Sequence, residues 1–458
     1  MSKNKKRKKK SNSERDSKAR TASAAVFFNE NKSIAGFGNS LRAVFTSVRE
    51  LVENSLDAAE HKGVTPNISI KLRRLKKQEL IELMGTNIIK IDDKKIDFIE
   101  LSCKDNGIGV PKSLIPQLFG TVLAGTKYGV QQARGRFGLG SKMVLLYAMS
   151  TLDLPIQITT RHEKDNLTHR VKLFIDLEKN QPIIHSEEQF EPGSNEYYEN
   201  TGTEIKVSFT GSWNMAKLYV KEYFKQLAII TPYADLFIDL PPDNDIHEPL
   251  IFQRVVDDIP NPPKVVNNHP WGTDISTFRR EINNSNDTNL ISFLTKNFMG
   301  VSEKSAKSFF DEVKVSTEKS PKALTSQEIR RIVHDGFSRA LKEARDPSIN
   351  VKDRIFGFKP PTGDSLSPLG AERLKKGLEK ELTPEFVHAI TRDPKAYEGH
   401  PFIIEAAIGY GGGVNKAAQS KGVTIVDNRI IYRFANRIPL IFGAGSDLIT
   451  NIVNNINW

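Results

Sequence analysis

Between residues 41 and 104 the spacing of hydrophobic residues changes from that of a helix to that of a strand, so this part of the chain must form both. Over residues 41–56 they recur at three- and four-residue steps, which indicates an amphipathic helix. Residues 68–72 and 99–103 instead alternate between apolar and polar side chains, which indicates half-buried strands. A helix next to half-buried strands predicts a first body that mixes helices with a sheet, in the α+β class.

The rest of the chain divides into further modules by its proline content and by the spacing of its hydrophobic residues. Prolines cluster between residues 241 and 270, residues 275–345 have helical spacing without a convincing strand pattern, and strand patterns return from residue 402. We therefore expect a basic tail, a first α/β domain, a linker, a small helical module and a second α/β domain. Their expected bounds are residues 1–24, 25–240, 241–264, 265–346 and 347–458.

Positive charge is concentrated at the start of the chain. The formal net charge is +11, from 66 Lys and Arg against 55 Asp and Glu, and the first 20 residues hold ten of these cations, six of them consecutive from Lys5 to Lys10. Polar residues follow the cluster, which excludes a secretory signal. Three interpretations of the segment remain: a solvated disordered tail, a nuclear localisation signal, or a nucleic-acid-binding arm. The segment predicts a nuclear location in a eukaryote and a cytoplasmic one otherwise.

Composition excludes two classes of protein. The chain of 458 residues has 38% hydrophobic residues and lacks a run of the ~20 apolar residues that a membrane helix needs, so we expect no membrane association. Cys103 is the single cysteine, which excludes an intramolecular disulfide and a multi-cysteine metal cluster. Its place in an alternating segment favours a small buried residue on a strand.

Glu50 and Asn54 form a polar pair on the expected first helix. They are four residues apart, so their side chains are neighbours on one helix face, and Asp57 continues that face. A carboxylate beside an amide oxygen can position a water next to a hydrated Mg²⁺, which prefers oxygen ligands. Taken alone, the same spacing also describes the solvated face of an ordinary amphipathic helix.

Two further motifs stand at strand ends. Asp105 follows the strand over residues 98–104, where its carboxylate can accept a hydrogen bond from an exocyclic amine such as that of adenine. Gly107 and Gly109 let the backbone approach a flat ring or a phosphate. Thr203 enters a later strand, where its hydroxyl can bind adenine through water. Each motif taken alone is also typical of a surface turn.

The segment Arg134–Lys142 holds three glycines and opens into an apolar helix. Backbone N–H groups at a helix N-terminus bind anions, and the helix dipole assists. The spacing is not that of a P-loop, and because no strand immediately precedes the segment, a Rossmann interpretation fails as well. A flexible lid over phosphates remains, to which Thr126 and Lys127 can add a hydroxyl and a cation.

The order of these motifs along the chain resembles that of the GHKL ATPase superfamily, which includes gyrase, heat-shock-90 chaperones, MutL and histidine kinases. The resemblance implies an α/β sandwich of the GHKL (Bergerat) type that binds ATP with Mg²⁺. It implies that Glu50 is the general base, that Asn54 is the metal ligand and that Asp105 reads the adenine amine. The other nucleotide-binding residues that it implies are Gly107, Gly109, Thr126, Lys127, Gly135, Arg136, Phe137, Gly138, Leu139, Gly140, Ser141, Lys142 and Thr203.

Five phrases narrow the resemblance to the B subunits of DNA topoisomerase VI. They lie at residues 27–37, 48–57, 269–274, 398–406 and 433–440. The similarity covers roughly residues 25–458, and two phrases look closer to plant-type than to archaeal versions. It implies that the helical module is a helix-two-turn-helix domain and that the last domain is a transducer.

The resemblance implies a type IIB topoisomerase that relaxes and decatenates DNA. Two B chains would dimerise on ATP to gate duplex DNA, in a heterotetramer with an A-type subunit that makes the break. The alternative is a non-hydrolysing, B-like scaffold for the meiotic double-strand-break complex. Another GHKL member, such as a chaperone or kinase, is a further alternative, against which the phrases at 269–274 and 398–406 argue.

The chain departs from the family pattern near its end. The family transducer continues past the position of Trp458 and carries a lysine that reaches the γ-phosphate, whereas the lysines in 347–458 lack that sequence context. We therefore expect a fragment, a truncated gene model or a shortened homologue that binds nucleotide and hydrolyses it slowly.

Overall fold

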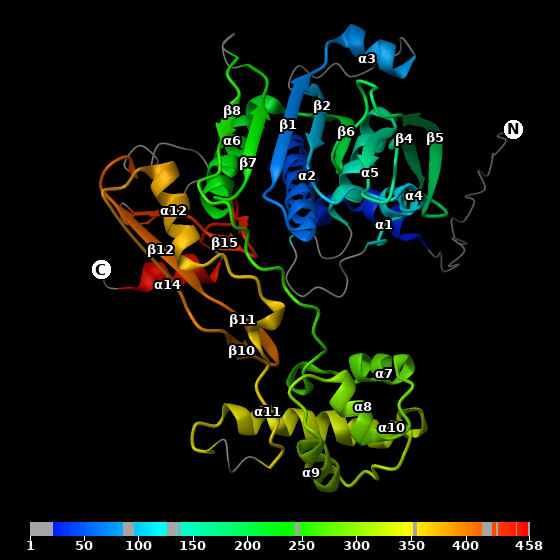
Figure 1. Ribbon diagram of the computed structural model, residues 1–458, viewed down its shortest axis with the longest axis vertical. Helices are drawn as coiled ribbons and strands as arrows, with labels where there is room; N and C mark the ends of the chain where they lie inside the picture. The colour runs from blue at the N-terminus through cyan, green and yellow to red at the C-terminus, as the bar shows by residue number, and fades with distance from the viewer. Residues whose placement is uncertain are drawn as a thin grey trace, which may run out of the picture.

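The computed structural model forms three bodies that follow one another along the chain (Figure 1). A sheet covered by helices comes first, a helical module lies apart from it, and a smaller α/β body packs back against the first. The structure describes residues 22–85, 96–125, 134, 139–242, 247–350, 355–414, 424–426, 429–445 and 447–456.

The first body is built on an eight-stranded sheet in the order β5-β4-β3-β6-β2-β1-β7-β8. The pair β1–β7 is parallel, and the other neighbouring pairs are antiparallel. The strands are β1 (Asn67–Arg74), β2 (Asp97–Lys104), β3 (Ile156–Arg161), β4 (Thr168–Asp176), β5 (Gln181–Phe190), β6 (Gly202–Gly211), β7 (Asp235–Asp239) and β8 (Leu250–Phe252).

Helices cover one face of this sheet, as the alternating pattern predicts. Ile68, Ile70 and Leu72 of β1 are fully buried or nearly so, while Lys71 between them is exposed. The central helix α2 contacts β1, β2 and β6, and it also contacts two neighbouring helices, α5 and α6. The helices are α1 (Ala24–Glu30), α2 (Ser40–Lys62), α3 (Lys77–Met84), α4 (Ile115–Gly120), α5 (Gly140–Leu152) and α6 (Trp213–Ile230). The expected α+β class is therefore confirmed.

Five elements of this body are absent from the sequence expectations, namely α1, α3, α4, β5 and β8. β5 is an edge strand whose side chains are mostly exposed, so it lacks the apolar alternation that reveals a half-buried strand. α3 is a short helix of eight residues with one buried side chain. β8 has three residues, lies within the segment expected to be a linker, and pairs with β7 at the other edge of the sheet.

The second body is the helical module. As expected, residues 275–345 contain helices and no strand, and all of them are described. Its core consists largely of phenylalanine rings, namely Phe278, Phe293, Phe298, Phe309, Phe310, Phe337, Phe356 and Phe358. The helices are α7 (Ile275–Asn284), α8 (Leu290–Asn297), α9 (Glu303–Val313), α10 (Ser326–Arg330), a π-helical segment (Arg331–Phe337) and α11 (Ser338–Arg345).

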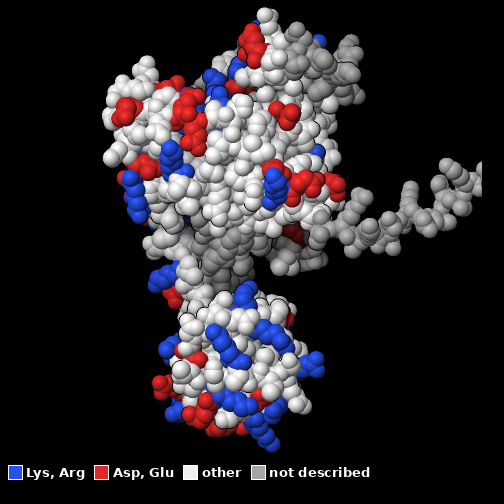
Figure 2. All heavy atoms as spheres, turned by 90° about the vertical axis from the view of Figure 1, so that its right-hand side faces the viewer, with Lys and Arg blue, Asp and Glu red and all other residues white. Residues whose placement is uncertain are grey.

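The module hangs below the first body and presents Lys and Arg interspersed with Asp and Glu on its visible face (Figure 2). The two chain segments that lead to and from it are joined, because the backbone N–H of Lys264 donates to the carbonyl of Asp364 at 2.9 Å. Among the described residues, no helix is both long enough and apolar enough to cross a membrane.

The phrases at 269–274 and 398–406 meet where the helical module joins the third body. A side chain on Gly272 would lie 2.6 Å from the backbone carbonyl of Glu398 and 3.2 Å from the His400 ring, so only glycine fits that approach. Arg345 at the end of α11 pairs with Glu398 at 3.2 Å. Two of the phrases that carry the family resemblance are therefore two sides of one contact.

The third body packs its helix α12 between α6 and a two-stranded sheet of β9 and β12. The sequence predicts continuous strands over 402–408 and 423–434, but β11 pairs with β10 and β12 pairs with β9, so each run is divided. The elements are α12 (Ala371–Leu382), β9 (Phe386–Thr391), β10 (Lys395–Tyr397), β11 (His400–Phe402), β12 (Glu405–Tyr410), β13 (Thr424–Val426), β14 (Arg429–Ile431), β15 (Phe434–Ala435), β16 (Ile438–Pro439) and α14 (Leu448–Asn455).

Gly377 provides a test of the packing of α12 on α6. A methyl group there would overlap the backbone carbonyl oxygen of Ile229, although Gly→Ala inside a helix ordinarily stabilises by roughly 0.5–1 kcal/mol. We predict that Gly377→Ala instead lowers the free energy of unfolding by about 1–3 kcal/mol, because α12 must shift. Urea unfolding of Gly377→Ala beside Lys376→Ala, which alters an exposed neighbour on α12, measures this. A Gly377→Ala protein as stable as the parent would contradict the packing.

Candidate functional site

Helix α2 brings the sequence-predicted residues together, because its buried side faces the ends of β2 and β6. The side chain of Ser55 donates a hydrogen bond to Oδ2 of Asp105 at 2.9 Å, across the helix–sheet interface. Glu50 lies about one and a half turns nearer the start of α2, and Asn54 lies between the two. The expected polar residues of the site therefore sit along one helix and at the strand end that it faces.

The Asp105 carboxylate is buried, with 8% of the residue exposed, and it is held from three directions. Besides the Ser55 bond, Oδ1 accepts the backbone N–H groups of Gly107 at 2.9 Å and Thr203 at 3.2 Å. Burial raises the pKa of Asp105 to about 6, although the hydrogen bonds from Gly107, Ser55 and Thr203 oppose the shift. Asp105 is thus a fixed acceptor that is poised to ionise near neutral pH.

The surroundings of Asp105 fit an adenine amine. A carboxylate has about four lone-pair sites, and three hydrogen bonds leave one of them for an incoming N–H donor. A side chain on Gly107 would lie 2.6 Å from Cβ of Ala58 on α2, and one on Gly202 would overlap the Asp105 carbonyl. These glycines therefore leave the backbone bare around the acceptor, as a flat ring requires.

Thr203 and Gly109 also belong to this neighbourhood. The hydroxyl of Thr203 is 3.0 Å from that of Thr160, which in turn donates to the Gly202 carbonyl at 2.9 Å and accepts from Val110 N–H at 3.0 Å. Gly109 has a φ of +74° and packs its Cα against the carbonyl of Arg161. Sequence reasoning missed Ser55 and Thr160, whose signal is a small hydroxyl residue on a buried face beside a strand end.

Glu50 lies beside two charged neighbours on α2. Arg49 forms an ion pair with Glu50 and a second one with Glu53 at 3.6 Å. Glu53 is buried, and burial together with the nearby Glu50 charge raises its pKa, so Glu53 holds a proton more readily than an ordinary glutamate. Glu50 is half-buried, and its carboxylate lies against Gly140, where any side chain would overlap it. No pattern in the sequence indicates the role of Arg49 and Glu53.

Asn54 is the residue expected to ligate Mg²⁺. It is half-buried on α2 and lies one turn after Glu50. Within the described ranges, no three His, Cys, Asp or Glu residues are grouped so as to hold a metal ion. The amide oxygen of Asn54 is the type of ligand that a cation such as Mg²⁺ can use when waters and substrate phosphates supply the others.

The glycine-rich segment is described in part. Leu139 caps α5, and Gly140 and Ser141 form its first turn, with Gly140 facing Glu50. The resemblance places Lys142 on the triphosphate, but this lysine is buried and its ammonium donates to the carbonyl of Ala124 at 2.6 Å. The remaining predicted residues, Thr126, Lys127, Gly135, Arg136, Phe137 and Gly138, lie outside the described residues.

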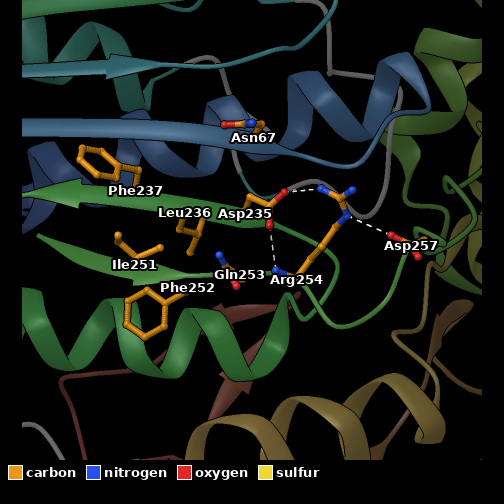
Figure 3. Close-up of a pocket in the computed structure, with 9 residues that line it drawn as sticks. All are labelled: Asn67, Asp235, Leu236, Phe237, Ile251, Phe252, Gln253, Arg254 and Asp257. Atoms are coloured by element: carbon orange, nitrogen blue, oxygen red, sulfur yellow. Dashed lines mark hydrogen bonds and ion pairs between the residues drawn. The ribbon is translucent and has the colours of Figure 1, made fainter.

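A separate cavity of about 510 Å³ lies at the β7–β8 edge of the sheet (Figure 3). Arg254 crosses it and pairs with Asp235 and with Asp257, the latter at 3.0 Å. None of its lining residues belongs to the predicted site, and its arginine is already neutralised by two carboxylates. The chemistry expected from the sequence is therefore gathered at α2 and Asp105.

Two family models match the chain. Residues 40–179 match the histidine kinase-, DNA gyrase B- and HSP90-like ATPase family. Residues 361–458 match the transducer of the topoisomerase VI B subunit. The first match contains Glu50, Asn54 and Asp105, and the second begins shortly before α12.

Curated relatives match nearly the whole chain in one alignment. The B subunit of type 2 DNA topoisomerase 6 from Metallosphaera sedula is 35% identical over 438 residues, which are 95% of this chain and 73% of the relative. The protein of the same name from Saccharolobus solfataricus is 36% identical over 440 residues, with the same shares covered.

The raised pKa of Asp105 predicts pH-dependent nucleotide affinity. A proton and an adenine amine compete for the same carboxylate, so affinity is full well above pH 6 and falls as the pH drops through it. From pH 7 to pH 5 the ionised fraction falls about tenfold, and we expect the affinity for an adenine nucleotide to fall by about the same factor. Calorimetric titration at several pH values measures this.

Asp105→Asn is the control for that titration. Asn is a poorer match for the amine, and losing a charge-assisted bond costs about 1.5–3 kcal/mol, so affinity at pH 7 should fall roughly 10–150-fold. The variant should also lose the part of the pH dependence that does not come from the nucleotide's own phosphates. Equal affinity and equal pH profiles for the two proteins would remove Asp105 from the site.

Proposed function

Because the chain belongs to the family of type 2 DNA topoisomerase 6 B subunits, we propose that it is the ATP-driven subunit of a type IIB DNA topoisomerase. One observation carries the proposal above the others. A single helix, α2, binds the buried Asp105 acceptor through Ser55 and presents Glu50 to the start of α5 through the bare backbone of Gly140. A nucleotide that reaches from Asp105 to Gly140 passes Glu50.

The residues of the chain divide the work on ATP as follows. Asp105 accepts the adenine amine, while Thr203 and Thr160 offer hydroxyls next to it. The first N–H groups of α5, beyond Gly140, attract phosphate oxygens through the helix dipole. Asn54 would hold Mg²⁺, which neutralises phosphate charge when it is bound. Glu50 orients the attacking water as a general base, and Arg49 fixes its position.

The whole assembly follows from the relatives' name and from the resemblance. Residues 25–240 serve as the ATPase domain, residues 265–346 as a helix-two-turn-helix domain and residues 347–458 as a transducer. Two such chains dimerise on ATP and act with an A-type subunit, in a heterotetramer, on duplex DNA that the A subunit cuts. The basic cluster Lys5–Lys10 directs a plant-type or other eukaryotic version to the nucleus.

The general-base assignment predicts that Glu50→Gln separates binding from hydrolysis. Gln keeps the size and a hydrogen-bond acceptor but cannot take a proton, so ATP turnover should fall by about 10²–10⁴-fold while nucleotide affinity changes little. Single-turnover hydrolysis and equilibrium binding on the same preparation measure the two quantities. Glu82→Gln, on the exposed face of α3, is the matched control.

Two results would count against this assignment. Undiminished turnover in Glu50→Gln would mean that Glu50 is not the general base and belongs to the solvated face of an amphipathic helix. Nucleotide binding without any turnover in the parent chain, even when it is combined with an A-type subunit and DNA, would favour the non-hydrolysing scaffold.

A further inference from the structure

A hairpin of the third body reaches into the first body and ends on helix α2. Strands β15 and β16 are joined by Asn436 and Arg437, both of which have positive φ, at +51° and +64°. Positive φ at both central residues is what a tight two-residue hairpin turn requires, and arginine is uncommon in that conformation. The turn delivers the Arg437 guanidinium to Glu60, in the last turn of α2, at 2.9 Å.

Glu60 is shared between two arginines from different parts of the chain. Its Oε2 accepts from Arg437, and its Oε1 accepts from Arg134 at 2.8 Å. The hydroxyl of Tyr233 donates to Oε1 at 2.7 Å and is itself within 3.2 Å of Arg437 and 3.4 Å of Arg134. Arg134 also binds Asp57 at 2.8 Å. Two guanidinium groups thus converge on one carboxylate and one phenol.

This five-residue network is almost completely buried. The exposed fraction is 1% for the side chain of Arg134, 9% for Arg437 and 11% for Glu60, and Tyr233 is fully buried. The two arginines balance Asp57 and Glu60 in charge. The arginines lower the pKa of Glu60 against the effect of its burial, so the carboxylate stays ionised. In such an environment each buried charge is stabilised by its partners. Removing one partner therefore leaves the others with an uncompensated charge.

The network stands between the nucleotide residues and the third body. Asp57 is one turn after Asn54 on the same face of α2. Arg134 is the first residue of the glycine-rich segment whose Gly140 lies beside Glu50. Arg437 is the one member of the network that comes from the third body, and Glu60 joins it to Arg134. Any shift of the β15–β16 hairpin therefore changes how Arg134 shares its acceptors.

We propose that Glu60, with Tyr233, is the positioning residue that couples Arg437 of the third body to Arg134 of the first body. This proposal rests on the proposed function, because it assumes that the site around Asp105 binds a nucleotide. With the hairpin seated, Arg437 shares Glu60 and Tyr233 with Arg134; when the hairpin moves, both partners pass to Arg134 alone. Because coupling of two sites is reciprocal, nucleotide binding must then alter how firmly the hairpin is held.

The experiment uses the full chain and a non-hydrolysable ATP analogue. Affinity is measured for the parent, Arg437→Ala, Arg437→Lys, Glu60→Gln and the Arg437→Ala/Glu60→Gln double variant. We expect Arg437→Ala to change affinity about fivefold or more and Arg437→Lys to restore part of it. In the Glu60→Gln background, Arg437→Ala should have no further effect, because the shared carboxylate charge is gone. Tyr233→Phe, which removes one hydroxyl, is the milder second variant should Glu60→Gln not fold.

The matched control is Arg373→Ala. Arg373 is also an arginine of the third body that binds the first, through Asp258 and the carbonyls of Asp258 and Ile259, but it does not touch Glu60. Its loss should leave affinity within about twofold of the parent. If Arg437→Ala behaves like Arg373→Ala, the inference is overturned.

Hydrogen exchange distinguishes coupling from a purely structural role of Glu60, because a structural role predicts no response of the hairpin to nucleotide. Adding the analogue should change the exchange rate of the amides of residues 434–438 several-fold in the parent, and should not do so in Glu60→Gln or Tyr233→Phe. An equal response in parent and variants would also overturn the inference. If the parent itself binds no analogue, the proposed function fails instead, so the two failures are distinct.

Discussion

The packing of α2 on the sheet places the polar groups that this helix contributes to the candidate site. One side of this helix is buried against β1, β2 and β6, and that burial fixes its rotation. Because the rotation is fixed, Ser55 meets Asp105, Glu50 meets Gly140, and Glu60 meets two arginines. The apolar contacts that anchor this helix thus decide which partner each of its polar side chains meets.

Close backbone approach is the second recurring device. Gly140 leaves room for the Glu50 carboxylate, Gly107 lets the strand end approach α2, and Gly377 lets α12 touch the backbone of α6. A side chain at Gly107 would meet Cβ of Ala58, and one at Gly377 would meet the carbonyl oxygen of Ile229, and neither helix can move aside at low cost. At Gly140 the neighbour is the end of the Glu50 side chain, which would have to turn away. These glycines are therefore needed for space as much as for backbone freedom, and they connect the site to the packing of the domains.

The contact between Gly272 and the Glu398–His400 turn explains why two phrases far apart in the sequence identify the same family. Neither phrase has an evident chemical role by itself. The surroundings of His269, the first residue of one phrase, indicate a structural role instead. Its ring is buried, hydrogen-bonds the carbonyl of Lys359 at 2.8 Å, and has its pKa lowered to about 4 by burial. That histidine is structural at neutral pH, and it holds the segment that returns from the helical module.

Apolar periodicity and motif order are local properties, so the amino-acid sequence alone predicts the layered α+β class, the helical module and the residues Glu50, Asn54 and Asp105. It does not reveal β5 or β8, since edge strands with exposed side chains lack that periodicity. Nor does it reveal that Lys142 is buried on the carbonyl of Ala124, or that Arg437 joins Glu60 from 377 residues away. Those pairings depend on which surfaces meet after the chain has packed, and they are therefore properties of the folded protein that no local pattern encodes.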